Sequence, residues 1–188
     1  LRRIAREGSS FALPALADDP IAHLVHACSM PEWLAKRWLA AYGPEEAAKL
    51  ASSMNAAAPV TVRVNRTKTS RDAILPELRT RFPEAVACRY SPDGIVLGRR
   101  GDVGQDPAFL AGLISPQDEA SQLVVHWLDP RPGERILDVC AAPGTKTAAI
   151  AERMAGQGQV LALDRHERRL GLVGRGTRRL ELTGIATL

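Results

Sequence analysis

The sequence predicts an α/β fold, in which a Rossmann-like domain is preceded by a small α+β module. Three observations support this prediction. The apolar run Arg135–Val139 stops at a loop of small residues, and a helical pattern follows the loop. A second apolar run then ends at Asp164. Earlier in the chain, strand-like and helix-like patterns succeed each other in a β-α-β-β order. A strand, a glycine-containing loop, a helix and a strand ending in an acid form the βαβ plan of nucleotide-binding sites.

The first part of the chain is expected to be helical after a linker. Residues 1–28 are interpreted as a linker with one short helix. Ser29 is expected to cap the next helix, with Glu32 completing a capping box, and Gly43 followed by proline is expected to end it. A second helix should follow directly. The residues expected to face inward in that helix are Ala47, Leu50, Ala51 and Met54.

The α+β module is expected to begin with a strand. Valines alternate with polar residues from Val60 to Val64, which is typical of a strand buried on one face. This alternation places Arg63 and Asn65 on the opposite face, where we expect them to be exposed. Arg66 follows the strand and is also expected to be exposed.

A helix and a hairpin complete the predicted module. Thr69 or Ser70 can cap the helix, and Pro76 should kink it or delay its start. The runs 86–90 and 95–97, joined by Ser-Pro-Asp-Gly, read as a hairpin. The exposed arginines at the end of this hairpin are expected to be Arg99 and Arg100.

The polar stretch 102–107 is interpreted as the boundary between modules, so that the expected domains are 29–112 and 113–188. Gln117 and Asp118 then precede a helix. The apolar side of this helix is expected to contain Leu123, Val124, Trp127 and Leu128.

The loop after the first Rossmann strand favours one class of ligand. Gly144 can adopt backbone angles closed to other residues, and Ala141 and Ala142 allow a ligand close to the main chain. The N–H groups that begin the next helix attract an anion, and Lys146 adds positive charge. Asp164 can accept hydrogen bonds from both hydroxyls of a ribose. S-adenosylmethionine carries both a carboxylate and a ribose.

Two other ligands fit these residues less well. A dinucleotide site needs three spaced glycines, whereas Ala142 and Lys146 flank the single Gly144. A GxxxxGK[ST] phosphate-binding loop is excluded because Thr145 precedes the lysine and Cys140 holds the first glycine position.

The segment Leu137–Thr147 resembles the cofactor loop of the Nol1/Nop2/Sun RNA 5-methylcytosine methyltransferases. The segments Ser115–Gln122 and Val62–Arg66 are similar to the Gln-Asp and Arg-x-Asn segments of that family. The segment Ser29–Trp38 is similar to the bacterial Fmu/Sun branch, which acts on the ribosomal small subunit. The resemblance implies an S-adenosylmethionine methyltransferase domain, of which this chain holds the N-terminal half, preceded by an RNA-recognition-like module.

The resemblance also implies a cofactor, a substrate and site residues. The cofactor would be S-adenosyl-L-methionine, and the substrate a cytosine of ribosomal RNA of the 16S type. The residues expected to bind the cofactor are Cys140, Ala141, Ala142, Pro143, Gly144, Thr145, Lys146 and Asp164. Those expected to contact RNA are Arg63, Asn65 and Arg66, and Arg99 and Arg100 could meet phosphates in the same way.

The chain departs from the family pattern at identifiable places. Thr145 stands where the family has a second glycine, and a β-branched residue there requires ordinary helical angles. Three glycines, Gly171, Gly174 and Gly176, each weaken the last helix by about 0.5–1 kcal/mol relative to alanine. We therefore expect fraying of that helix.

The resemblance implies catalysis by a cysteine thiolate that attacks C6 of the target base, with a second cysteine assisting release. Both are expected downstream of Leu188, so that no catalytic residue is assigned in this chain and Cys140 is not a substitute. The isolated chain is expected to be inactive, and the strand at 135–139 to have an open edge. Two alternatives remain: a non-catalytic RNA-binding scaffold that keeps the loop as structure, and a small-molecule methyltransferase.

Composition agrees with these expectations. No apolar run has the roughly 18 residues of a membrane span, and three widely separated cysteines favour reduced thiols and a cytoplasmic protein. His23, His26 and Cys28 are not followed by a second ligand cluster, so no metal is expected, and a monomer is expected. Arginines number 21 and lysines 4, with a formal net charge of +4. This suits a polyanionic partner, although codon bias explains the excess equally well.

Overall fold

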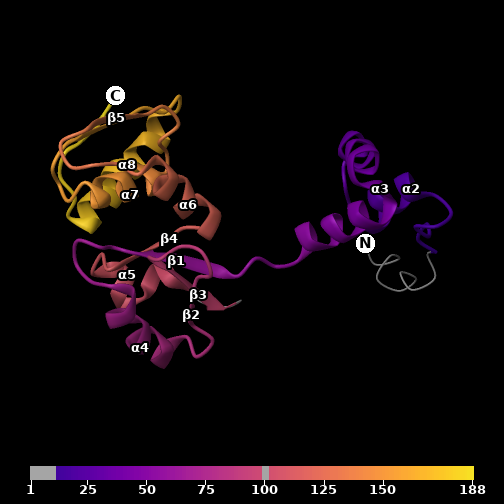
Figure 1. Cartoon of the computed structure of the whole chain (residues 1–188), viewed down its shortest axis with the longest axis horizontal. Helices are drawn as coiled ribbons and strands as arrows, with labels where there is room; N and C mark the ends of the chain where they lie inside the picture. The colour runs from indigo at the N-terminus through magenta and orange to yellow at the C-terminus, as the bar shows by residue number, and fades with distance from the viewer. Residues whose placement is uncertain (1–11, 99–101) are drawn as a thin grey trace. The chain divides into compact units, whose positions relative to one another are not determined.

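The computed structural model describes residues 12–98 and 102–188 and contains two compact units, Leu1–Ala57 and Ala58–Leu188. In the first unit, α2 (Pro20–Ala22) leads into a π-helical turn at His23–Ala27, and α3 spans Glu32–Asn55 (Figure 1). Within α3, Gly43 adopts φ 75° and ψ 172°, which separates two helical segments. The break that glycine followed by proline predicts is therefore confirmed.

The predicted capping box at the start of α3 is wrong. The residue that precedes the helix is Pro31, and no side chain caps the helix. Ser29 lies further back in a left-handed conformation, with φ 56°. The N–H of Met30 donates to the carbonyl of Leu24 at 2.9 Å, which closes the preceding turn instead.

The core of the first unit is small. Leu24, Ala35, Ala47 and Ala51 are fully buried, and Leu50 is half-buried. Met54 is 66% exposed, which contradicts its predicted inward position, because the last turn of α3 extends beyond this buried cluster. The inward face of the second segment is therefore shorter than its apolar pattern suggests.

The second unit begins with a four-stranded antiparallel sheet of order β2-β3-β1-β4 (Figure 1). Its elements are β1 (Val60–Val64), α4 (Arg71–Arg81), β2 (Val86–Ala87), β3 (Gly94–Gly98), a 3-10 turn at Val103–Gln105, α5 (Pro107–Leu110) and β4 (Ile114–Pro116). In the register, Val62 pairs with Ile95 and Val64 with Ile114. The predicted β-α-β-β order and hairpin are confirmed.

Helix α4 covers one face of this sheet through Ile74 and Leu78, which are buried with the valines of β1. Ser70 caps it as predicted, because its Oγ accepts from the N–H of Ala73 at 3.2 Å. The helix begins at Arg71 and continues through Pro76, so the expected delay of its start is wrong.

The predicted domain boundary is misplaced. Strand β4 pairs with β1, so residues 114–116 belong to the sheet of the α+β module rather than to the Rossmann half. The polar stretch 102–107 is a 3-10 turn that leads into α5, within the same module. We refer to residues 58–116 as the α+β module.

The remaining elements form the predicted βαβ arrangement. They are α6 (Glu119–Leu128), β5 (Arg135–Asp138), α7 (Thr145–Arg153), β6 (Gln159–Ala162), α8 (Glu167–Leu180) and β7 (Ile185–Thr187). The three strands are parallel in the order β5-β6-β7. Strand β5 lies at the edge of this sheet, as the sequence predicts.

The predicted apolar side of α6 is wrong. Val124, Trp127 and Leu128 are exposed, Trp127 to 83%, whereas Gln122 and Val125 are buried. The side-chain amide of Gln122 donates to the carbonyl of Gln117 at 2.9 Å, so this polar side chain is hydrogen-bonded on the buried face of α6.

No helix among residues 12–98 and 102–188 is long and apolar enough to cross a membrane.

Candidate functional site

The loop between β5 and α7, residues 139–144, requires glycine at its last position. Gly144 has φ 106°, a conformation that side chains with a Cβ rarely adopt. A Cβ added there would lie 3.0 Å from the Cα of Val173 in α8. The loop can therefore pass this close to α8 only because residue 144 is glycine. The peptide bond between Ala142 and Pro143 is cis.

Helix α7 begins at Thr145, immediately after this glycine. No side chain caps the helix, so the N–H groups of its first turn remain free of intrahelical partners and can bind an anion. Thr145 has no positive φ, so a β-branched residue fits this backbone. Lys146 is exposed beside the same turn.

Asp164 follows β6 and contacts the loop through its side chain. Its Oδ2 accepts from the N–H of Ala142 at 3.1 Å, and its Oδ1 accepts from the N–H of His166 at 2.9 Å. These two hydrogen bonds, that from His166 first, lower the pKa of the Asp164 carboxyl below its ordinary value. The carboxylate therefore stays ionised, with lone pairs left for further donors.

A second carboxylate, that of Asp138, contacts the loop and the first turn of α7 and was not predicted from the sequence. Asp138 ends β5, and its Oδ2 accepts from the hydroxyl of Thr147 at 2.7 Å. Its Oδ1 accepts from the N–H of Cys140 at 3.3 Å. The sequence did contain a signal for this contact: an acid ends the strand, and a threonine follows nine residues later in the next helix. These bonds fix the start of α7 relative to β5.

The three cysteines differ in accessibility. Cys140 is exposed in the loop, whereas Cys28 and Cys88 are buried. Burial raises the pKa of the Cys88 thiol to about 11, and the nearby Glu119 carboxylate acts in the same direction. Cys88 is therefore protonated and unreactive at neutral pH.

The predicted exposure of Arg63 and Asn65 is wrong. Arg63 is 4% exposed, and its Nη2 lies 2.6 Å from Oε1 of the buried Glu152 in α7. Its Nη1 donates to the carbonyl of Thr145 at 2.9 Å and to the side chain of Gln117. These contacts occupy the guanidinium, so Arg63 is a structural residue between β1 and α7.

Asn65 is fully buried, and its amide donates to the carbonyls of Gly112 and Leu180 at 3.0 and 3.2 Å. Arg66 remains half-exposed, with its Nε 3.6 Å from Oδ1 of Asp93. Of the residues expected to contact RNA, Arg66 alone is accessible among those described. Arg99 and Arg100 lie outside the described residues.

A cavity of about 430 Å³ adjoins the loop on the side of α8 and β4. Its walls include Phe109 and Pro116 of the α+β module, Gly144 and Thr145 of the loop region, and Arg175 of α8. Asp164 is not among the residues that line this cavity.

The residues of the loop fit S-adenosylmethionine. The uncapped turn at Thr145 suits a carboxylate, and Asp164 suits ribose hydroxyls. Among the described residues, no group of three His, Cys, Asp or Glu side chains is placed to hold a metal ion.

Comparison with known proteins gives consistent results for both parts of the chain. Residues 30–104 match the RsmF/B-like methyltransferase ferredoxin-like domain, and residues 125–188 match the 16S rRNA methyltransferase RsmB/F family. The ribosomal RNA small subunit methyltransferase B of Pseudomonas putida is 42% identical over 182 residues, which is 97% of this chain and 40% of that protein. The probable counterpart in Bacillus subtilis is 38% identical over 185 residues, again 97% and 40%. The chain thus spans about two fifths of these relatives.

Solved structures agree in fold. A methyltransferase homologue from Pyrococcus horikoshii superimposes with a TM-score of 0.79 at 29% identity, covering 87% of this chain and 54% of that one. A structure described as NSun6 from the same organism gives a TM-score of 0.76 at 18% identity, covering 84% and 65%, and shows the same fold. The resemblance found in the sequence is confirmed, and residues 30–104 and 125–188 are identified as methyltransferase domains of the RsmB/F type.

Proposed function

We propose that this chain forms the cofactor-binding part of an S-adenosylmethionine-dependent methyltransferase that modifies C5 of a cytosine in small-subunit ribosomal RNA. The observation that carries the proposal is the hydrogen bond from the Ala142 N–H to Asp164 Oδ2. This bond supports the proposal because Asp164, the proposed ribose-binding acid, lies beside the loop proposed to hold the amino-acid end of the cofactor.

Each part of the site has a distinct task. The N–H groups at the start of α7 would bind the carboxylate of the cofactor, with Lys146 adding positive charge. Asp164 would accept from the ribose hydroxyls, and its lowered pKa keeps it an acceptor at neutral pH. Bound S-adenosylmethionine supplies an electrophilic methyl group. Asp138 and Thr147 hold the loop in place for this binding.

The assignment of RNA as the substrate, and of cytosine C5 as the methylated atom, depends on the resemblance to the family. Relatives that carry the name of ribosomal RNA small subunit methyltransferase support the RNA class. A cysteine nucleophile would have to come from outside these 188 residues, because Cys28 and Cys88 are buried and Cys140 belongs to the cofactor-binding loop. A single-stranded or flipped-out base is expected, since C5 is hard to reach within a helix.

Calorimetry with S-adenosylmethionine tests the cofactor site. We expect binding by the unaltered chain, and an affinity roughly tenfold or more lower for Asp164→Ala, the scale of a lost hydrogen bond to a charged group. The matched control is Asp72→Ala, which removes an exposed carboxylate on α4 and should leave affinity unchanged. Absence of binding by the unaltered chain would favour the non-catalytic scaffold instead.

A further inference from the structure

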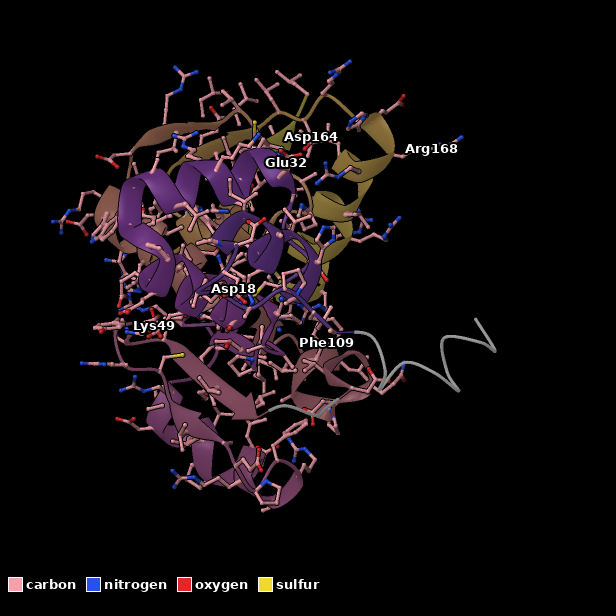
Figure 2. All side chains as sticks on the ribbon, turned by 90° about the vertical axis from the view of Figure 1, so that its right-hand side faces the viewer. Asp18, Glu32, Lys49, Phe109, Asp164 and Arg168 are labelled. Carbon is pink, nitrogen blue, oxygen red and sulfur yellow. The ribbon has the colours of Figure 1, made fainter. Side chains whose placement is uncertain are left out.

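Helix α8 presents an exposed row of arginines. Arg168, Arg175 and Arg178 are separated by seven and three residues, which places them on one face of the helix. All three are exposed, and Figure 2 shows Arg168 directed away from the helix. We call these three residues the arginine stripe. At 1.5 Å per residue the stripe is roughly 15 Å long.

The charge of the stripe is not neutralised within the described chain. Among residues 12–98 and 102–188, no carboxylate lies within ion-pair distance of any stripe arginine. Arg179, the neighbour in sequence, is different: it stacks on Phe109 at 3.8 Å and donates to the carbonyl of Ile114 at 3.0 Å. Arg179 is therefore a structural residue, whereas the stripe remains available to a partner.

One glycine of α8 leaves the same surface without a side chain. Gly171 lies between the stripe arginines, and a Cβ added to it would meet no atom within 4 Å. Gly171 has no positive φ. It weakens the helix by about 0.5–1 kcal/mol, and no requirement of packing or backbone conformation within the described chain accounts for that cost. A partner whose own backbone approaches the helix closely would account for it.

The stripe adjoins the cofactor-binding loop. The neighbouring Arg169 donates from its Nη2 to the carbonyl of Ala142 at 3.1 Å. Arg175 lines the cavity of about 430 Å³ whose other walls include Gly144 and Thr145. A polyanion lying on the stripe would thus run beside the site where the methyl donor is proposed to bind.

We propose that the arginine stripe of α8 docks the sugar-phosphate backbone of the substrate RNA. The inference rests on the proposed function and extends it by naming the surface. Arginine binds phosphate oxygens through two parallel N–H donors, which suits three exposed and unpaired guanidinium groups in a row. The contact is to the backbone, so it positions the RNA without reading its sequence.

The experiment measures fluorescence anisotropy of a short labelled single-stranded RNA with the 188-residue chain over a range of salt concentrations. The test variant replaces Arg168, Arg175 and Arg178 with glutamine. Each phosphate contact contributes about 0.7 to the slope of log K against log salt for single strands, so the slope should fall by about 2. Affinity should fall about tenfold to hundredfold near 0.1 M salt.

Two further variants distinguish a specific contact of the arginine stripe from a general effect of charge. Replacing the same three residues with lysine preserves charge and should retain most of the salt slope. The matched control replaces Arg37, Arg89 and Arg135 with glutamine, an equal loss of charge from exposed sites elsewhere, and should leave most of the slope in place. Circular dichroism verifies that each variant is folded.

The outcomes separate this inference from the proposed function. A stripe variant that loses no more slope than the control overturns the docking surface, as does an unaltered chain that does not bind RNA. Binding of S-adenosylmethionine is measured separately by calorimetry. If the cofactor binds normally while the stripe variant leaves RNA binding unchanged, the cofactor assignment stands and the docking surface does not.

Discussion

Arg63 and Glu152, 89 residues apart in sequence, form a buried ion pair that joins the α+β module to α7, the helix after the loop at residues 139–144. Arg63 Nη2 lies 2.6 Å from Glu152 Oε1, and Nε lies 3.1 Å from Oε2. The same guanidinium donates to the carbonyl of Thr145. The position of β1 is thereby linked to the first residue of α7.

Removal of one partner of this pair should be strongly destabilising. We expect Arg63→Ala to lower the free energy of unfolding by about 3–5 kcal/mol, because it leaves the Glu152 carboxylate buried without a counter-ion. Replacing both residues with methionine should be much less harmful. Urea denaturation gives both values. A loss below about 1 kcal/mol for Arg63→Ala would show that the pair is not buried as described.

The Glu152 carboxyl should leave a signature in the pH dependence of stability. Burial raises its pKa above the ordinary value of 4.5, although Arg63 opposes the shift. The folded state then binds the Glu152 proton more tightly than the unfolded state does. The protonated carboxyl therefore contributes its full stabilisation below pH 4.5, and this contribution is lost as pH rises through the pKa of Glu152 in the folded state.

We therefore expect the unaltered chain to lose stability relative to Glu152→Gln as pH rises above about 4.5, because glutamine does not titrate. Urea midpoints of the two proteins across this range measure the difference. A relative gain would mean that Arg63 lowers the pKa of Glu152 below its ordinary value.

Thiol chemistry should distinguish the cysteines. At neutral pH a thiol reagent is expected to modify Cys140 rapidly, because it is exposed in the loop. Cys88 should react only after unfolding, since it is buried and its pKa is raised to about 11. Mass spectrometry after limited labelling locates the modified residue.

The same labelling reports on the cofactor. S-adenosylmethionine should slow modification of Cys140 if it occupies the loop, while adenosine triphosphate at equal concentration should not. Equal rates with and without S-adenosylmethionine would contradict the proposed cofactor contact.

Two glycine substitutions should have opposite effects. Gly144→Ala is expected to destabilise the chain by about 1–2 kcal/mol or more, because φ is 106° and the new Cβ would press on Val173. It should also weaken binding of S-adenosylmethionine. Gly171→Ala should instead stabilise α8 by about 0.5–1 kcal/mol, since its Cβ meets open space. Thermal and urea unfolding of both variants tests this pair.

Much of the fold could be predicted because it depends on local chemistry. The valines at 60, 62 and 64 indicate β1, Ser70 caps α4, and Gly144 marks the turn into α7. Turns, helix caps and hydrophobic periodicity depend on residues that are close together in the chain. They can therefore be recognised in a single sequence. The loop and Asp164 were predicted for the same reason.

The sequence by itself determined the βαβ plan, the loop of small residues between β5 and α7, and the resemblance to a methyltransferase family. Tertiary structure alone decided that both faces of β1 are buried, which removes Arg63 and Asn65 from the surface. It also decided that α6 packs through Gln122 and Val125, while Val124, Trp127 and Leu128 are exposed. Strand alternation indicates which side chains share a face, but not what covers that face. For Arg63 the cover is Glu152 in α7, and only the folded chain brings the two together.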